Sequence, residues 1–210
     1  MTGKIQLNPS SGGGSFSLQA PSSSANDRVV TLPDIADGTL LTSQSTLDST
    51  KLSPAISGGL EMADQWRITS GFSFSSLSVM TANWERVDTN GYGQLGTGMT
   101  ESSGIFTFPS TGIYHIDFRA SGSVVNVTNF VGTIIRATTD GSNFSTAAAQ
   151  YGSSPSANYN SGQSTQHIFD VTNTSTHKVC FAGEAGATVS YDGSSSISYT
   201  NVVFTKLGDT

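Results

Sequence analysis

The sequence predicts an all-β protein whose larger part is a jelly-roll β-sandwich. Residues 112–120 alternate between apolar and polar side chains, which is the period of a half-buried strand. Turn signals such as Asn90-Gly91, Asp140-Gly141 and Asp192-Gly193 divide the second part of the chain into roughly eight to ten short segments. None of these segments has a convincing helical period. Many short strands without helices indicate a sandwich or jelly roll.

The alternating segment and the residues before it form the central motif of the chain. Two aromatic residues precede a turn and two more follow it, so a hairpin that places four rings in one core is predicted. The residues of this core motif are Phe106, Phe108, Pro109, Gly112, Tyr114 and Phe118.

Other elements follow from shorter patterns. A short helical turn is expected near residues 60–66, and a polar exposed loop is expected at 151–162. The expected strands cover residues 67–73, 84–88, 104–108, 112–120, 130–137, 165–171, 178–182, 187–191 and 197–206.

Composition divides the chain into three parts: an extended arm (1–41), a Ser/Thr-rich linker (42–63) and a head (64–210). The apolar residues of the arm come in pairs too small to form a core. Either disorder or pairing with other chains follows, and the regular spacing favours pairing. The residues expected to dock are Ile5, Leu7, Phe16, Leu18, Val30, Leu32 and Pro33.

Charge and composition exclude several classes of protein. Charged residues are 11% of the chain, against about 25% in typical domains. The net charge of −6 and the absence of basic runs argue against nucleic-acid binding, and no apolar run is long enough for a membrane span. The single cysteine, Cys180, allows no intrachain disulfide and is expected to be buried and inert.

The N-terminus has no signal-peptide pattern, whereas the hydroxyl-rich, charge-poor composition is common in extracellular and virion β-proteins. We therefore expect a protein made in a host cytoplasm that works on the exterior of a phage particle.

Two resemblances add to this interpretation. Residues 15–21 and 29–34 resemble a short module of bacteriophage fibres, which implies an intertwined trimeric stalk. The pattern Gly104-x-Phe106-x-x-Pro109-x-x-Gly112-x-Tyr114-x-x-x-Phe118 is similar to the globular domain of the C1q and tumour-necrosis-factor-like superfamily, which implies a homotrimeric head. Ile197 and Thr200-Asn201 depart from the family's last strand, so no ligand or calcium site is carried over.

Catalytic, metal and cofactor sites are not expected. The three histidines, His115, His167 and His177, lack a Gly-x-Ser-x-Gly elbow. The acidic pairs Glu61/Asp64 and Glu85/Asp88 could serve a glycosidase but are better explained as solvated surface charge.

Loop residues offer two further candidate sites. The segment 88–92 has oxygen ligands and a glycine but lacks the later glutamate of a calcium loop, so a plain turn is favoured. Tyr92, Tyr151 and Tyr159 could contact sugars on a host surface, although ordinary loop tyrosines are the simpler explanation.

These observations predict a non-enzymatic, homotrimeric virion protein of a bacteriophage, either a capsid decoration protein or a head fibre. Its partners would be other phage capsid or tail proteins, reached by strand addition from the arm. The alternative is a short tail fibre whose tip contacts host surface glycans. A carbohydrate-active enzyme lacks a visible cleft with paired carboxylates, and a bacterial C1q-like adhesin is disfavoured by the missing signal peptide.

Overall fold

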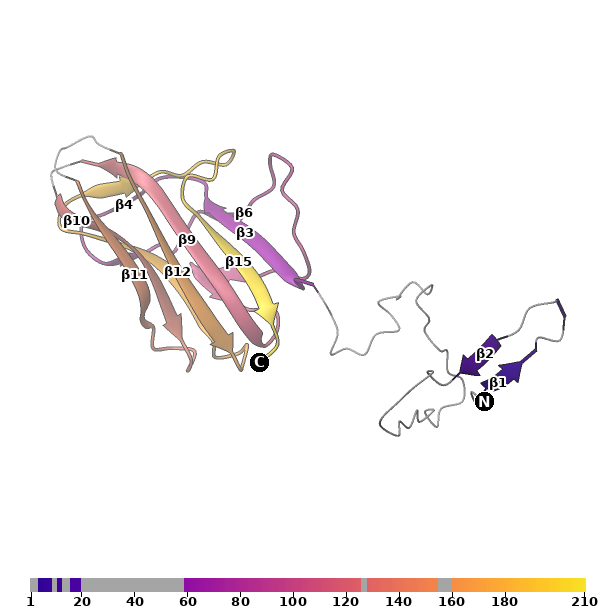
Figure 1. Ribbon diagram of the computed structural model, residues 1–210. Coiled ribbons are helices and arrows are strands. Elements are labelled where there is room, and N and C mark those ends of the chain that lie inside the picture. Colours follow the sequence, from indigo (N-terminus) through magenta and orange to yellow (C-terminus); the bar gives the residue numbers. More distant parts are fainter. Residues whose placement is uncertain (1–3, 9–10, 13–15, 20–58, 126–127, 155–159) are drawn as a thin grey trace. The chain divides into compact units, whose positions relative to one another are not determined.

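The computed structural model describes residues 4–8, 11–12, 16–19, 59–125, 128–154 and 160–210 (Figure 1). The chain forms two compact units, Met1–Ser57 and Gly58–Thr210. The second unit begins before the predicted start of the head at residue 64, and from here on we call this whole unit the head. Each unit is described by itself.

The first unit contains an antiparallel pair, β1 (Lys4–Leu7) and β2 (Phe16–Gln19). Ile5 lies opposite Leu18 and Leu7 opposite Phe16. These two strands pair within one chain, and the pairing of the arm with other chains stays a prediction. Val30, Leu32 and Pro33 fall outside the described residues.

The head consists of two antiparallel sheets, which we name after their central strands. The β9 sheet runs in the order β4 (Phe72–Phe74), β14 (Val189–Tyr191), β9 (Gly112–Val124), β15 (Asn201–Gly208), β3 (Met62–Ile68) and β6 (Trp84–Arg86), with β12 (Asn160–Val171) also paired to β9. The β13 sheet runs in the order β11 (Ser145–Ser154), β10 (Thr128–Thr138), β13 (Lys178–Ala185), β8 (Ile105–Thr107) and β7 (Thr100–Ser102), with β5 (Ser78–Val79) also paired to β13.

The core lies between these sheets and is rich in aromatic rings. Phe106, Phe108, Tyr114 and Phe118 are all buried. The rings of Phe108 and Tyr114 lie 4.7 Å apart, and the Phe118 ring lies 4.9 Å from that of Phe181 on the opposite sheet. Ring pairs at this separation add to the stabilisation from burying apolar area.

The predicted hairpin around residues 109–112 is wrong. β8 pairs with β13 and β7, whereas β9 pairs with β12, β14 and β15, so this turn carries the chain from one sheet to the other. Both strands point their aromatic residues into the shared core, and this common direction looked like a hairpin in the sequence. Gly112 has a φ of 143°, and a Cβ there would meet the Lys206 side chain and the Gly208 carbonyl. The chain can therefore pass this point only with glycine.

Other boundaries also differ from the prediction. The expected helical turn at 60–66 is the start of β3, because pairing with β15 overrides helix propensity. The expected strand 67–73 ends at Ile68, and a new strand begins at Phe72. Most of the predicted loop at 151–162 belongs to β11 and β12, whose Ser- and Gly-rich sequences hid two long strands.

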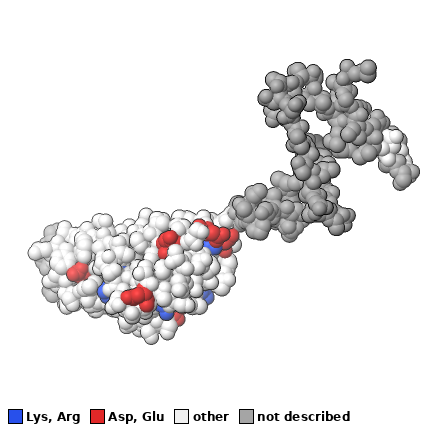
Figure 2. All heavy atoms as spheres, turned by 90° about the horizontal axis from the view of Figure 1, so that it is seen from below, with Lys and Arg blue, Asp and Glu red and all other residues white. Residues whose placement is uncertain are grey.

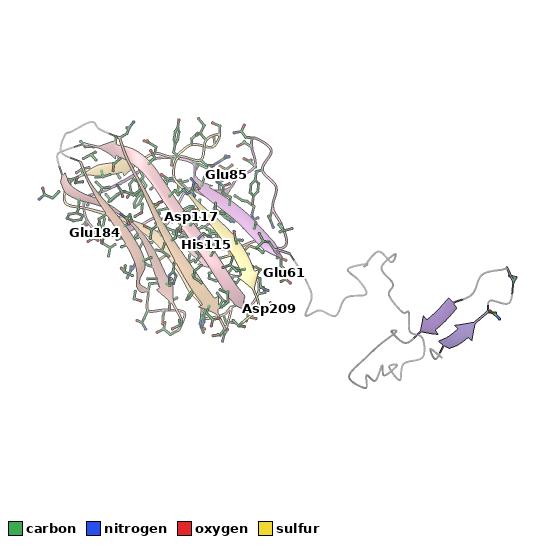
Figure 3. The ribbon with its side chains drawn as sticks, viewed as in Figure 1. Glu61, Glu85, His115, Asp117, Glu184 and Asp209 are labelled. Carbon is green, nitrogen blue, oxygen red and sulfur yellow. The ribbon has the colours of Figure 1, made fainter. Side chains whose placement is uncertain are left out.

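One ionic contact joins the start and the end of the head. The Nζ of Lys206 lies 3.0 Å from Glu61 Oε2 and 2.7 Å from Asp209 Oδ1. Glu61 and Asp209 are labelled at neighbouring positions in Figure 3. Hydrogen bonds to Asp209 and Glu61 hold the pKa of Lys206 above its ordinary value despite its burial. The described residues contain no helix that could cross a membrane.

Candidate interaction surface

The side of the β9 sheet that faces away from the core carries charges that are paired with each other. Strand register places its residues in rows across β12, β9, β15 and β3. Ile168 lies opposite His115 in this register and is 54% exposed. We call this surface the outer face. Its rows are Gln166, Asp117, Val203 and Gln65; then Ile168, His115, Thr205 and Ala63; then Ser164, Arg119, Asn201 and Arg67.

Opposite charges on the outer face neutralise each other. Arg119 lies 2.6 Å from Asp117, and its Nε also donates to this carboxylate. The hydrogen bond to Asp117 raises the pKa of Arg119. Figure 3 labels Asp117 and His115 along β9. The ion pair leaves this part of the outer face without net charge. Figure 2 shows another side of the head, seen from below, on which charged side chains are scattered among uncharged areas.

The adjoining edge of the sandwich is also poor in charge. β11 contains no charged residue, and Asp170 is the only one in β12. Free sheet edges usually carry Lys, Glu or Pro to prevent pairing with other chains. The β11 and β12 strands have almost none of this protection, so they are suited to contact another protein surface.

Tyr151 lies on β11 and not in a loop as predicted. It is 46% exposed, its hydroxyl donates to Glu184 Oε2 at 2.7 Å, and its ring packs edge-on against Phe130. The hydrogen bond to Glu184 raises the pKa of Tyr151. The side chain is thus held in one orientation on the surface. Tyr159 falls outside the described residues.

The end of the same sheet formed by β3 and β6 contains a buried carboxylate. Asp64 is 1% exposed and accepts hydrogen bonds from Trp66 Nε1 (2.9 Å), the Tyr92 hydroxyl (2.8 Å) and the Met99 N–H (2.7 Å). The Arg86 guanidinium donates from 3.0 Å. Burial raises the pKa of Asp64, but these hydrogen bonds outweigh burial and hold it below 3.8. The prediction that Asp64 is solvated is wrong.

Arg67 is the second buried charge of this end of the sheet. Its guanidinium lies 2.7 Å from Asp88 Oδ1 and 3.2 Å from Glu85 Oε1, and it donates to the Thr89 hydroxyl and the Ser195 carbonyl. The pair Glu85/Asp88 therefore neutralises a buried cation and is not free surface charge. These contacts hold two loops, 88–92 and 194–200, against each other.

The predicted alternative of calcium binding at 88–92 finds no support in this geometry. The Asp88 carboxylate pairs with Arg67, and Asn90 donates its side-chain N–H to the Ser196 carbonyl at 3.1 Å. Across the described ranges, no group of three or more His, Cys, Asp or Glu side chains could hold a metal ion.

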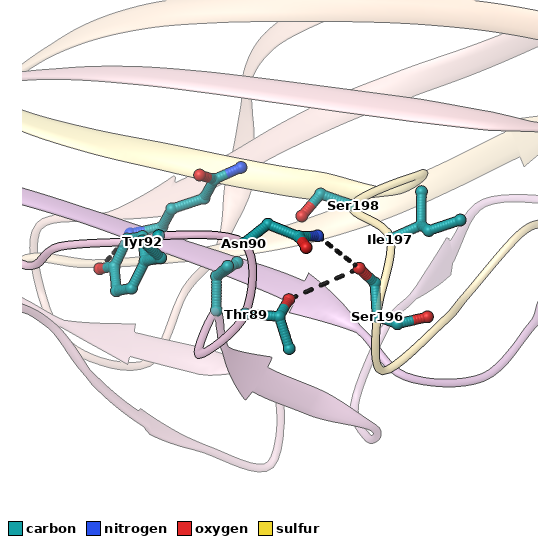
Figure 4. A pocket seen from close by; sticks show the side chains of 9 residues that line it. Thr89, Asn90, Tyr92, Ser196, Ile197 and Ser198 are labelled. Carbon is teal, nitrogen blue, oxygen red and sulfur yellow. Dashed lines mark hydrogen bonds between the residues drawn. The ribbon is translucent and has the colours of Figure 1, made fainter.

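A hollow of about 290 Å³ lies between these two loops (Figure 4). Tyr92 lines it but is only partly exposed, and its hydroxyl is occupied by Asp64, so the ring is the part available to a ligand. Burial raises the pKa of Tyr92 to about 12. The lining residues are Gln65, Val87, Thr89, Asn90, Gly91, Tyr92, Ser196, Ile197 and Ser198.

A second hollow of about 390 Å³ adjoins the 194–200 loop and shares Ser198 with the first. It opens on the outer face beside Arg119, Gln163 and Tyr199, and Tyr199 is exposed. The loop therefore has a shallow hollow on each side, and sequence reasoning found neither of them.

Two of the histidines, His167 and His177, and the cysteine Cys180 are held in structural contacts. His177 is buried, and its ring nitrogens lie within hydrogen-bond distance of the Thr172 and Thr176 hydroxyls. The rings of His167 and His177 both pack against Phe169. Cys180 is buried, and burial raises its pKa to about 11, so its thiol is unreactive at neutral pH.

Comparison with known proteins identifies the fold of the head. No family model and no curated protein matches the chain. Murine APRIL is similar in structure with a TM-score of 0.50 and 18% identity, over 70% of this chain and 98% of that protein. The Eiger TNF of S. frugiperda is similar with a TM-score of 0.50 and 14% identity, over 71% of this chain and 94% of that protein. The head is a TNF-like jelly roll. These comparisons confirm the predicted fold of the head and do not extend to function.

Proposed function

We propose that this protein is a non-enzymatic structural component of a bacteriophage particle, a homotrimeric capsid decoration protein or head fibre. The head would project from the exterior of the virion, and the N-terminal arm would attach it to other phage proteins. The observation that carries the proposal is the combination of a TNF-like head with a sheet edge, β11 and β12, that is almost free of charge and adjoins the paired charges of the outer face. The separate N-terminal unit, with its short strand pair, supports an attachment role.

We infer that the trimer forms through two different surfaces of the head. The β11 and β12 edge of one head would pack on the outer face of the next, and this contact would bury Ile168 and the neutral Asp117–Arg119 pair. A contact between unlike surfaces forms a closed ring when the rotation closes. Three copies would complete the ring, as the C1q and TNF-like resemblance implies.

Light scattering on the full chain tests the trimer. We expect a homotrimer at micromolar concentration that persists in mild denaturant. A monomer under these conditions would remove the trimer from the proposal.

Attachment by the arm is a separate step. We expect backbone hydrogen bonds from the arm strands to add to a capsid subunit, with Ile5, Leu7, Phe16, Leu18, Val30, Leu32 and Pro33 as the docking residues. Deletion of residues 1–41 should abolish attachment to particles and leave the cooperative unfolding of the head intact. Attachment that persists in the truncated protein would contradict the docking role.

A short tail fibre is the second candidate, and Tyr151 favours it. This tyrosine is exposed, ordered by Glu184 and Phe130, and surrounded by small neutral residues of β11. Such an aromatic ring can stack on a host surface glycan. Tyr151→Ala should then reduce adsorption to host cells, whereas Tyr151→Phe, which keeps the ring, should not. Unchanged adsorption of Tyr151→Ala would contradict glycan binding by Tyr151 and leave the capsid decoration or head-fibre proposal.

A further inference from the structure

The hollow between the 88–92 and 194–200 loops has unused hydrogen-bonding groups whose identities follow from the contacts. A backbone carbonyl only accepts hydrogen bonds, so the contact of Asn90 with the Ser196 carbonyl must come from Nδ2. The Oδ1 of Asn90 is the remaining atom, and it has no partner among the described residues. Figure 4 shows the Asn90 and Thr89 side chains joined to Ser196 across the two loops.

The same reasoning identifies a second acceptor on the opposite wall. The Ser198 carbonyl accepts from Asn201 Nδ2 at 2.9 Å, which leaves Asn201 Oδ1 to accept from Gln65 Nε2 at 3.3 Å. Gln65 Oε1 is thereby left without a partner within the described part of the chain. The Ser198 hydroxyl makes no hydrogen bond to those residues either. Asn90, Gln65 and Ser198 all line the hollow.

The other residues that line the hollow are apolar or already have hydrogen-bond partners. Tyr92 presents its ring, because its hydroxyl is bound to Asp64. Val87 and Ile197 add aliphatic surface, and Ile197 is 49% exposed. The Thr89 hydroxyl accepts from Arg67, and the Ser196 hydroxyl lies 3.2 Å from that of Ser194.

The charge of the hollow limits the class of ligand. None of its lining residues is charged, and the nearby Arg67 guanidinium is fully buried and paired with Asp88 and Glu85. An anion would therefore find no free cation. Two amide acceptors and one hydroxyl require a ligand that donates several hydrogen bonds, while the ring and aliphatic walls suit a C–H surface.

We propose that this hollow binds a neutral monosaccharide unit, whose hydroxyls donate to Asn90 Oδ1 and Gln65 Oε1 and whose ring packs against Tyr92. Its volume of about 290 Å³ is at the small end for ligand pockets, which favours a single sugar ring. The two loops are held together by Arg67 and by the Asn90–Ser196 hydrogen bond, so the site exists before the ligand binds. The site does not depend on where the protein lies on a virion.

Saturation-transfer NMR on the full chain tests this site with glucose, galactose, mannose and N-acetylglucosamine as probes. We expect at least one of these sugars to bind saturably with a Kd of about 1 mM, as few hydrogen bonds and a small contact area allow. Ser198→Ala removes a hydroxyl, and Gln65→Met removes the Oε1 acceptor together with the Nε2 donor to Asn201; each should weaken binding roughly 5-fold. The double variant should bind too weakly to measure.

A control variant separates this site from general effects. Ser123→Ala, on β9 and outside the lining of the hollow, should leave the Kd unchanged. No saturable signal from any of the four sugars would overturn the proposal. Binding that is unchanged in the Ser198→Ala/Gln65→Met variant would place the sugar elsewhere and would equally overturn it.

Discussion

The two lateral ends of the β9 sheet, at β3 and at β12, differ in their content of charged residues. At the β3 side, Asp64 and Arg67 are buried and surrounded by partners that hold the neighbouring loops in place. At the β12 side, the strand and its neighbour β11 carry a single charged residue between them, Asp170. Both sides belong to one chain in which only 11% of residues are charged.

The ionic groups of this charge-poor head are concentrated at the β3 end and almost absent from the β12 end. Charges at the β3 side order loops and complete a hollow, so they act within one molecule. Their near absence at the β12 side removes the usual barrier to association between molecules. The β3 side thus carries buried ion pairs that connect loops, and the β12 side is the one that we propose for association.

Arg67→Ala should have the largest effect and tests the β3 side. Removal of the guanidinium leaves Glu85 and Asp88 without their cation and detaches the two loops. We expect a loss of about 3 kcal/mol in the free energy of unfolding, the lower end of the range for a buried pair because Asp88 is largely exposed. Urea denaturation measures this loss.

Arg119→Ala is the matched control for that variant. Its ion pair with Asp117 lies on the outer face, and the Arg119 side chain is 61% exposed. The loss should stay below about 1 kcal/mol. Equal losses in the two variants would contradict the contrast between the two sides.

Asp64→Asn should have the second largest effect. The amide keeps the size of the carboxylate but weakens its ionic hydrogen bonds, at a cost of about 2 kcal/mol. Because the folded pKa of Asp64 lies below that of the unfolded chain, its stabilisation is present above about pH 4 and is lost as the pH falls through the folded pKa. Unfolding of both proteins between pH 6 and about pH 2 should therefore show a smaller acid-induced loss in Asp64→Asn than in the natural chain. Parallel curves would argue against an ionised Asp64.

Tyr92→Phe should have a smaller effect. It removes one hydrogen bond to Asp64 and one from the Gln65 N–H but keeps the ring in place. We expect a loss of about 1 kcal/mol in thermal or urea unfolding. A loss as large as that of Asp64→Asn would mean that the hydroxyl, and not the whole cluster, holds the carboxylate.

Ile168→Lys should have the smallest effect on the stability of a single head, within about 0.5 kcal/mol, because the side chain is exposed there. Its effect on association should be large, since three lysines would enter a neutral interface. We expect dissociation at concentrations at which the natural chain is a trimer, measured by light scattering. Leu77→Lys, at another exposed apolar position, is the control and should remain a trimer.

Period-two patterns predicted the fold wherever strands were flanked by clear turns. The alternation in 112–120 correctly indicated β9, with Tyr114, Ile116 and Phe118 directed into the core. The β11 and β12 strands were shorter or absent in the prediction, because Ala, Ser, Gly and Gln carry little apolar contrast between the two faces of a strand. Pairing with β9 and β10 decides their conformation, and a local pattern does not contain that information.

The site was harder to predict than the fold. Asp64 and Arg67 look like ordinary surface charges, since their partners Met99, Asp88 and Ser195 are distant in sequence. The alternation Met62, Asp64, Trp66 was the available signal, because it places a carboxylate between two core residues on one side of a strand. The hollow depends on two loops joined across more than a hundred residues, which spacing alone cannot reveal.

The contact of Lys206 with both Glu61 and Asp209 has a practical consequence. It places Glu61, near the start of the head, and Asp209, near its end, next to each other. A compact module with adjacent ends can be grafted into a surface turn of an unrelated carrier without stretching either chain. The head should therefore tolerate insertion into such a turn, because its two ends lie close together.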